Sequence, residues 1–218
     1  MALYLYLPQH GSPPYQTVIY YPGAVAQNVE SVDQYRTIHL DFILKSGRAV
    51  AFPVYTGTFE RRLKAPPNGP IAVRDLFVQS ANDLRRSIDY LETRRDLRPN
   101  GFAYYGYSAG GALAPIFLFD EPRIRAAILY MAGFYPDRLP PEIEPSTFAP
   151  RLKLPIKMLS ARLDDAFPLA TSAVPFFQRL GTPGEHKQHV IAEGGHIVDP
   201  PTLMRETLDW LDKYLGKP

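Results

Sequence analysis

The chain has 218 residues, enough for one α/β domain with a substantial core and too few for two. Its 45 % hydrophobic content is ordinary for a globular protein, and its formal charge of +2, from scattered basic residues, gives no nucleic-acid-binding face. There is no cysteine, which excludes a thiol nucleophile, disulfides and thiolate metal sites. We therefore expect a single domain over residues 1–218.

The N-terminal segment, residues 1–8, has no basic stretch before its apolar residues. It is typical of a strand rather than of a signal peptide. No apolar run reaches the length needed to span a membrane. We expect a cytoplasmic protein that has no membrane partner.

Short apolar segments bounded by turn residues predict strands. In chain order they are residues 3–7, 16–21, 49–55, 101–105, 126–131, 156–160 and 186–192. Segments with apolar residues at helical spacing predict helices. These are residues 29–44, 73–94, 112–119, 171–180 and 202–215.

This alternation of strands and helices predicts an α/β fold. We expect a mostly parallel sheet of about seven strands with helices on both faces. The first strand could pair antiparallel with the second, because a turn-rich link, residues 8–14, separates them.

The sequence Gly106-Tyr107-Ser108-Ala109-Gly110 stands directly after the strand at 101–105 and before an apolar helix. In that context G-x-S-x-G is a nucleophile elbow, a sharp strand-to-helix turn that exposes its serine. Glycines two residues before and after the serine avoid a collision inside the turn. Ser108 is therefore the predicted nucleophile.

A serine hydroxyl needs a base, and the base needs a carboxylate to orient it. Among five histidines, His196 is the one that follows a strand end, after two glycines that let the backbone bend. Functional residues in such sheets lie in loops at the carboxyl ends of strands. His196 is therefore the predicted base.

The acid is expected after the strand at 156–160, where Asp164 and Asp165 are adjacent. We favour Asp164, although Asp165 stays open as the alternative. Glu193 and Asp199 are weaker candidates because they lie close to His196 in the sequence. The order Ser, Asp, His is that of α/β-hydrolase triads.

A developing oxyanion needs two fixed N–H donors. One is expected from Ala109, directly after the nucleophile. The other should come from the loop after the second strand, where Pro22 has no N–H to give. Ala24 is our first candidate for this donor and Gly23 the alternative.

Residues 133–155, where this fold often inserts a lid, are few and rich in proline, so we expect no large cap domain. An open site suited to short acyl chains follows from this. Phe134, Tyr135 and Phe167 are candidates for lining it. No metal or cofactor motif is present, and a small-molecule ester is the expected partner.

Together these residues resemble the α/β-hydrolase superfamily. Much of the chain resembles the hydrolase module at the C-terminus of some bacterial serine/threonine protein kinases, which is related to dienelactone hydrolases and prolyl oligopeptidases. The resemblance rests on residues 46–50, 55–62, 83–94 and 207–216. In that family a single Asp stands at the position of the acid and is followed by Phe-Pro. The resemblance therefore supports Asp164 as the acid. Dienelactone hydrolases use a cysteine, which is absent, so that activity is not implied.

The superfamily's usual sheet has eight strands, one more than predicted here. A sheet edge left exposed would favour a homo-oligomer. The function that the motifs favour is a serine carboxylesterase acting through an acyl-enzyme. The alternatives are a prolyl-oligopeptidase-like peptidase and a non-catalytic module of a larger kinase-fused protein.

Overall fold

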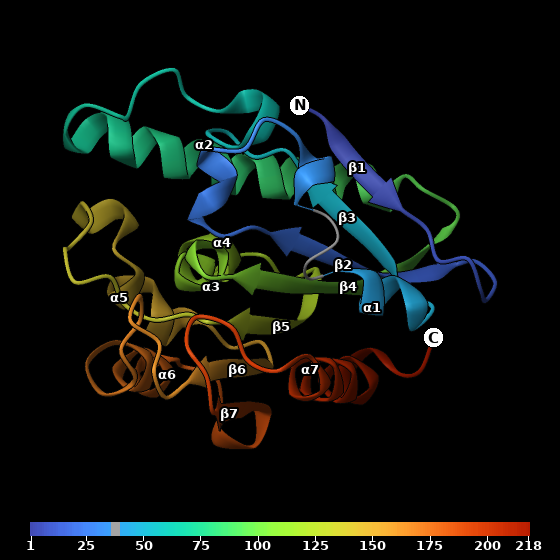
Figure 1. Ribbon diagram of the computed structural model, residues 1–218. Coiled ribbons are helices and arrows are strands. Elements are labelled where there is room, and N and C mark those ends of the chain that lie inside the picture. Colours follow the sequence, from blue (N-terminus) through green and yellow to red (C-terminus); the bar gives the residue numbers. More distant parts are fainter. Residues whose placement is uncertain (36–39) are drawn as a thin grey trace.

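The computed structural model describes residues 1–35 and 40–218, and its seven strands form one sheet in the order β1-β3-β2-β4-β5-β6-β7 (Figure 1). All neighbouring pairs are parallel except β1 and β3. The mostly parallel sheet of about seven strands is thus confirmed. The strands are β1 (Leu3–Tyr6), β2 (Tyr15–Tyr21), β3 (Ala49–Pro53), β4 (Leu97–Tyr107), β5 (Ile124–Tyr130), β6 (Ile156–Ala161) and β7 (Lys187–Ala192).

The expected pairing of the first strand with the second is wrong. β1 pairs antiparallel with β3, from Leu3 opposite Pro53 to Tyr6 opposite Val50. The reason is that β2 has β3 on one side and β4 on the other, so both of its edges are occupied. The remaining edge of β3 is the place where β1 can form a ladder.

Helices cover both faces of the sheet and make three layers (Figure 1). One face carries α2, α3, α4, α5 and α6, and the other carries α1 and α7. The α-helices are α1 (Asp41–Lys45), α2 (Gly69–Glu92), α3 (Ala109–Ala112), α4 (Ala114–Leu118), α5 (Pro145–Phe148), α6 (Val174–Arg179) and α7 (Pro200–Leu215).

Alternate residues of each central strand point to the two cores. Along β4, Tyr104 packs under α2 and α4, whereas Ala103 and Tyr105 pack on the side of α7. All three side chains are fully buried. Strands covered on both faces have almost no polar positions, which explains why they were recognisable as continuous apolar runs.

The helix expected over residues 29–44 is wrong as a single element. The structure has a 3-10 turn, Val32–Gln34, and the short helix α1, while residues 36–39, which include the expected helix position Ile38, lie outside the described residues. Ser31 caps the 3-10 turn by accepting a hydrogen bond from the Asp33 N–H. Val32, Tyr35 and Ile43 reach the same core from these separate short turns, so their apolar spacing does not need one long helix.

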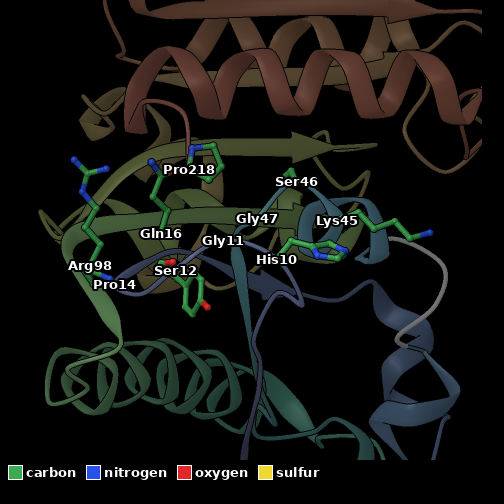
Figure 2. Close-up of a pocket in the computed structure, with 11 residues that line it drawn as sticks. His10, Gly11, Ser12, Pro14, Gln16, Lys45, Ser46, Gly47, Arg98 and Pro218 are labelled. Carbon is green, nitrogen blue, oxygen red and sulfur yellow. The ribbon is translucent and has the colours of Figure 1, made fainter.

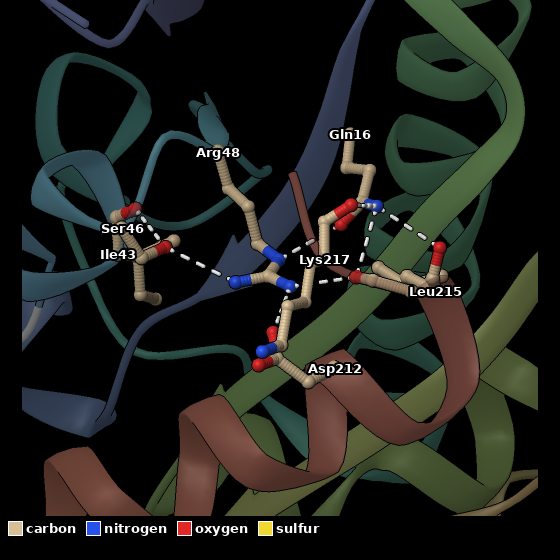
Figure 3. Close-up of polar contacts among 8 residues, drawn as sticks. Gln16, Ile43, Ser46, Arg48, Asp212, Leu215 and Lys217 are labelled. Atoms are coloured by element: carbon tan, nitrogen blue, oxygen red, sulfur yellow. Dashed lines mark hydrogen bonds and ion pairs between the residues drawn. The ribbon is translucent and has the colours of Figure 1, made fainter. Parts of the chain in front are cut away.

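A buried arginine joins the end of α7 to the amino-terminal ends of β2 and β3 (Figure 3). Arg48 is 1 % exposed, and its Nη2 lies 2.5 Å from Asp212 Oδ1. Its Nε donates to Gln16 Oε1 at 2.9 Å, and Gln16 Nε2 donates to the Leu215 carbonyl at 2.9 Å. A buried charge needs such partners, so these contacts fix α7 against β2 and β3.

Within the described residues, no helix combines the length and the apolar character that crossing a membrane requires.

We expect His189 of β7 to make the free energy of unfolding depend on pH. Its Nε2 lies 2.9 Å from Ser160 Oγ, its ring packs on Phe177, and burial lowers the pKa of His189 to about 4. The unfolded chain takes up this proton near pH 6.5 and the folded chain near pH 4, so stability is lost as pH falls between the two. The wild-type free energy of unfolding should fall between pH 7 and pH 5, and we expect His189→Gln to reduce this fall by ~1 kcal/mol, a value discounted for solvent screening.

Urea denaturation at the two pH values measures this difference. His10→Gln, at an exposed histidine, is the matched control and should keep the wild-type pH dependence. Equal pH dependence in wild type and His189→Gln would contradict the prediction.

Candidate active site

Ser108 stands in the turn between β4 and α3 with an unusual backbone conformation. Its φ is 52° and its ψ is −112°, a region that side chains other than glycine rarely adopt. The Ser108 N–H donates to the Tyr130 carbonyl at 2.8 Å, and the Ser108 carbonyl accepts from the Ala112 N–H at 2.9 Å. The next strand and the following helix therefore hold the strained residue from both sides.

Two glycines make this turn possible because the backbone closes on itself there. A Cβ on Gly106 would lie 2.5 Å from the Gly110 carbonyl oxygen. A Cβ on Gly110 would collide with the Tyr21 carbonyl oxygen of β2. The spacing of the glycines around Ser108 is thus a steric requirement of the turn.

His196 reaches Ser108 from a tight loop after β7. Its Nε2 lies 2.8 Å from Ser108 Oγ. Gly194 begins the loop with a φ of 134°, and a bridge between Gly194 and Val198 closes it. The Val198 N–H donates to the Tyr130 hydroxyl at 3.0 Å, which ties the loop to β5.

Asp164 lies behind His196, with its two carboxylate oxygens 2.9 and 3.0 Å from His196 Nδ1. The residue is 4 % exposed, and its Oδ1 also accepts the N–H groups of Ala166 and Phe167. These bonds orient the carboxylate. They also select the imidazole tautomer that has its proton on Nδ1, so that Nε2 can accept the Ser108 proton.

The other carboxylates near the loop have different partners. Asp165 is exposed, Glu193 pairs with Arg162 at 2.6 Å, and Asp199 caps α7 by accepting from the Thr202 N–H at 2.9 Å. The structure therefore places Asp164, and not these three, against His196.

Ala24 and Ala109, whose amides are expected to hold an oxyanion, both line one small cavity. Ala109 and Ala24 each begin a short helix, so neither N–H has an acceptor within its own helix. Gly23, the alternative donor, gives its N–H to the Tyr35 hydroxyl at 3.1 Å. A Cβ built on Gly23 would lie 3.2 Å from Ser108 Cβ, so this loop passes directly beside the serine.

The three aromatic residues expected at the pocket lie in different places. The Phe167 ring is 6.0 Å from the His196 ring, and the Tyr135 ring is 5.4 Å from Phe167. Phe134 packs instead against Phe176 of α6, with ring centroids 5.0 Å apart. Phe167 thus lies near the histidine, Tyr135 lies next to Phe167, and Phe134 belongs to the core between β5 and α6.

Three tyrosines support the site and were not predicted. Tyr130 accepts from Ser108 through its carbonyl and from Val198 through its hydroxyl, and Tyr35 holds Gly23. Tyr107 lies on His196, with ring centroids 5.6 Å apart, and burial raises the pKa of its phenol. For Tyr130, its position in the sequence could have indicated this role, because it is the last residue of β5, the strand that pairs with β4.

No protein-family model and no curated protein matches the chain. Solved structures do match it over almost its whole length. One is a cold-adapted esterase from an Arctic intertidal metagenomic library, 20 % identical over 98 % of this chain and 88 % of that one, with a TM-score of 0.73. Another is TT1662 from Thermus thermophilus, 20 % identical over 99 % and 94 %, with a TM-score of 0.76. The esterase Pf2001 from Pyrococcus furiosus is 16 % identical over 94 % and 85 %, with a TM-score of 0.71.

The chain has the α/β-hydrolase fold. None of these three structures is described as part of a protein kinase, so the resemblance to kinase-fused modules has no support from them. The α/β-hydrolase sheet places Ser108, Asp164 and His196 at the carboxyl ends of β4, β6 and β7, where ligands bind in parallel sheets.

A hollow of about 260 Å³ lies at the other end of the α/β-hydrolase sheet (Figure 2). Its walls come from the segments that enter β2, β3 and β4, among them Ser12, Gly47 and Arg98. Since Ser108 follows the far end of β4, this hollow is separate from the candidate active site. Among residues 1–35 and 40–218, no group of three or more His, Asp or Glu side chains could hold a metal ion.

The steric role of Gly106 can be tested through stability. We expect Gly106→Ala to lower the free energy of unfolding by ~1–3 kcal/mol, because the added methyl group meets fixed backbone atoms. Gly184→Ala is the matched control, since a Cβ there meets nothing within 4 Å, and it should change stability by less than about 0.5 kcal/mol. Urea denaturation of the two variants measures both values, and equal stability of the two would refute the steric account.

Proposed function

We propose that the protein is a serine carboxylesterase that hydrolyses short-chain acyl esters. The observation that carries this proposal is the unbroken hydrogen-bonded series from Ser108 through His196 to the buried Asp164. The likeness in fold to two proteins described as esterases supports it. Fold alone does not define a reaction, so the weight rests on the geometry of the side chains.

The proposed reaction has two steps. Ser108 Oγ attacks the ester carbonyl carbon while His196 Nε2 takes its proton, and the Ala24 and Ala109 N–H groups hold the oxyanion. His196 then gives this proton to the leaving alkoxide as the C–O bond breaks, which leaves an acyl-enzyme. A water molecule, deprotonated by His196, attacks the acyl-enzyme and releases the acid and Ser108. Asp164 keeps the imidazole oriented and stabilises its charged form.

The expected substrates are small because little covers the site. In the described part of the chain, the segment between β5 and β6 forms only short helices, including α5 and the 3-10 turns Pro141–Ile143 and Ala149–Arg151. Such a segment cannot enclose a long acyl chain as a multi-helix lid does.

The first test is hydrolysis of p-nitrophenyl acetate by wild type and Ser108→Ala. We expect the variant to lose about 10⁴-fold or more in kcat/KM, because no other group can form the acyl-enzyme. Circular dichroism and a thermal melt confirm that the variant is folded. Equal rates from the two proteins would disprove the esterase proposal and favour a non-catalytic module.

The same two proteins should be assayed on a peptidyl p-nitroanilide. A peptidase would cleave this amide in a Ser108-dependent reaction, whereas the proposed esterase prefers the ester. The ratio of the two rates therefore distinguishes the two hydrolases.

The adjacent aspartates offer a matched pair of variants. We expect Asp164→Asn to reduce kcat by about 10⁴-fold, because an amide favours the wrong imidazole tautomer while it preserves the shape of the site. Asp165→Asn, at an exposed position, should keep wild-type activity. Steady-state kinetics measures both, and a large loss in Asp165→Asn with activity kept in Asp164→Asn would reverse the assignment.

A further inference from the structure

The loop after β2 passes Ser108 at a glycine. A Cβ built on Gly23 would lie 3.2 Å from Ser108 Cβ and 3.1 Å from Tyr107 Cδ1, closer than most side chains approach. The position therefore favours glycine, the residue whose backbone turns most freely. A hydrogen-bond donor that follows such a residue keeps its direction only if other contacts hold the backbone there.

Two hydrogen bonds hold the peptide groups on the two sides of Gly23. The Gly23 carbonyl accepts from the Ala26 N–H at 3.1 Å, at the start of the 3-10 turn Ala24–Gln27. In a trans peptide the C=O and the next N–H point in opposite directions, so the Ala24 N–H points away from this turn. On the other side, the Gly23 N–H donates to the Tyr35 hydroxyl at 3.1 Å, in the buried interior.

Tyr35 is itself held firmly by the core. It is 5 % exposed, and the centroid of its ring lies 5.7 Å from that of Phe59 and 6.4 Å from that of Phe52. The Tyr35 N–H donates to the Val32 carbonyl at 2.9 Å. Burial raises the pKa of Tyr35, so the group stays a neutral hydroxyl with a lone pair that accepts the Gly23 N–H.

Resting on the proposed esterase activity, we propose that Tyr35 is a positioning residue for the oxyanion site. By accepting the Gly23 N–H, the Tyr35 hydroxyl fixes the rotation of the backbone at Gly23 and with it the direction of the Ala24 N–H. The same bond occupies the Gly23 N–H, so that Ala24 is the donor that this loop offers to the oxyanion. Tyr35 acts through the loop and not through contact with the ester.

The test is Tyr35→Phe, which keeps the ring and removes the hydroxyl. A donor to the oxyanion acts mainly in the transition state, and the outright loss of one costs about 10²–10³-fold in kcat. A donor that is present but misdirected loses part of this, so kcat for p-nitrophenyl acetate should fall ~10-fold or more. KM should change by less than ~2-fold, because the ground state depends little on this bond.

Inhibition by a short alkyl trifluoromethyl ketone gives a second readout. Ser108 Oγ bonds to the carbonyl carbon of the ketone, its proton passes to His196, and the carbonyl oxygen becomes the oxyanion of a tetrahedral adduct. The Ki for this ketone should rise in Tyr35→Phe by about the factor by which kcat/KM falls. A smaller fraction of folded protein cannot change Ki, because Ki is a property of each folded molecule.

Tyr105→Phe is the matched control, since it makes the same change in the same core. Tyr105 is fully buried, and in the described part of the chain its hydroxyl has no hydrogen-bond partner. This variant should keep the wild-type kcat, KM and Ki.

The outcomes separate this inference from the proposed function. Wild-type kcat and Ki in Tyr35→Phe would refute the positioning role and leave the esterase proposal standing. A lower kcat with an unchanged Ki would also refute it, because the lost hydroxyl would then only reduce the amount of folded enzyme. If the wild type shows no hydrolysis that Ser108→Ala abolishes, the proposed function falls and this inference falls with it.

Discussion

The positive φ of Ser108 is the constraint on which the rest of the site depends. A strained residue of this kind costs about 1–3 kcal/mol and persists only where its surroundings determine it. Here the Tyr130 carbonyl holds its N–H, and the absence of side chains at Gly106 and Gly110 lets strand and helix close on it. The result is a hydroxyl presented beyond the end of β4, the middle strand of the sheet.

Hydrogen bonds between neighbouring loops hold Asp164 and His196 in place relative to Ser108. The Leu163 N–H donates to the Gly194 carbonyl at 2.9 Å, so the loop before Asp164 and the loop before His196 are joined directly. Tyr130 joins the second of these loops to Ser108, because it bonds Val198 with its hydroxyl and Ser108 with its carbonyl. Groups placed this way keep their mutual geometry without a conformational change, which is what proton transfer from Ser108 to His196 requires.

Features with local signals could be predicted from the sequence, and features set by distant contacts could not. The inner strands could be recognised because strands buried on both faces are continuous apolar runs, and the edge strands β1 and β7 because turn residues bound them. The elbow could be recognised because its glycines are a local steric need. The pairing of β1 depended on which sheet edge was still free, a property of the assembled sheet. The choice between Gly23 and Ala24 depended on Tyr35, whose hydroxyl engages the Gly23 N–H from 12 residues away.

The sheet divides the site into two halves on either side of β4. The β6 and β7 half carries His196, the proposed proton acceptor, and Asp164, which orients its ring, and its geometry is fixed by backbone bonds between loops. The β2 and β3 half carries Ala24 and the small cavity beside Ser108, one wall of which is Leu76 of the helix α2. A substitution on that helix can change the space beside Ser108 while the bonds among Ser108, His196 and Asp164 stay intact. The space beside Ser108 is therefore expected to vary independently of the proton-transfer groups, since its walls come from other loops and helices than those that carry Asp164 and His196.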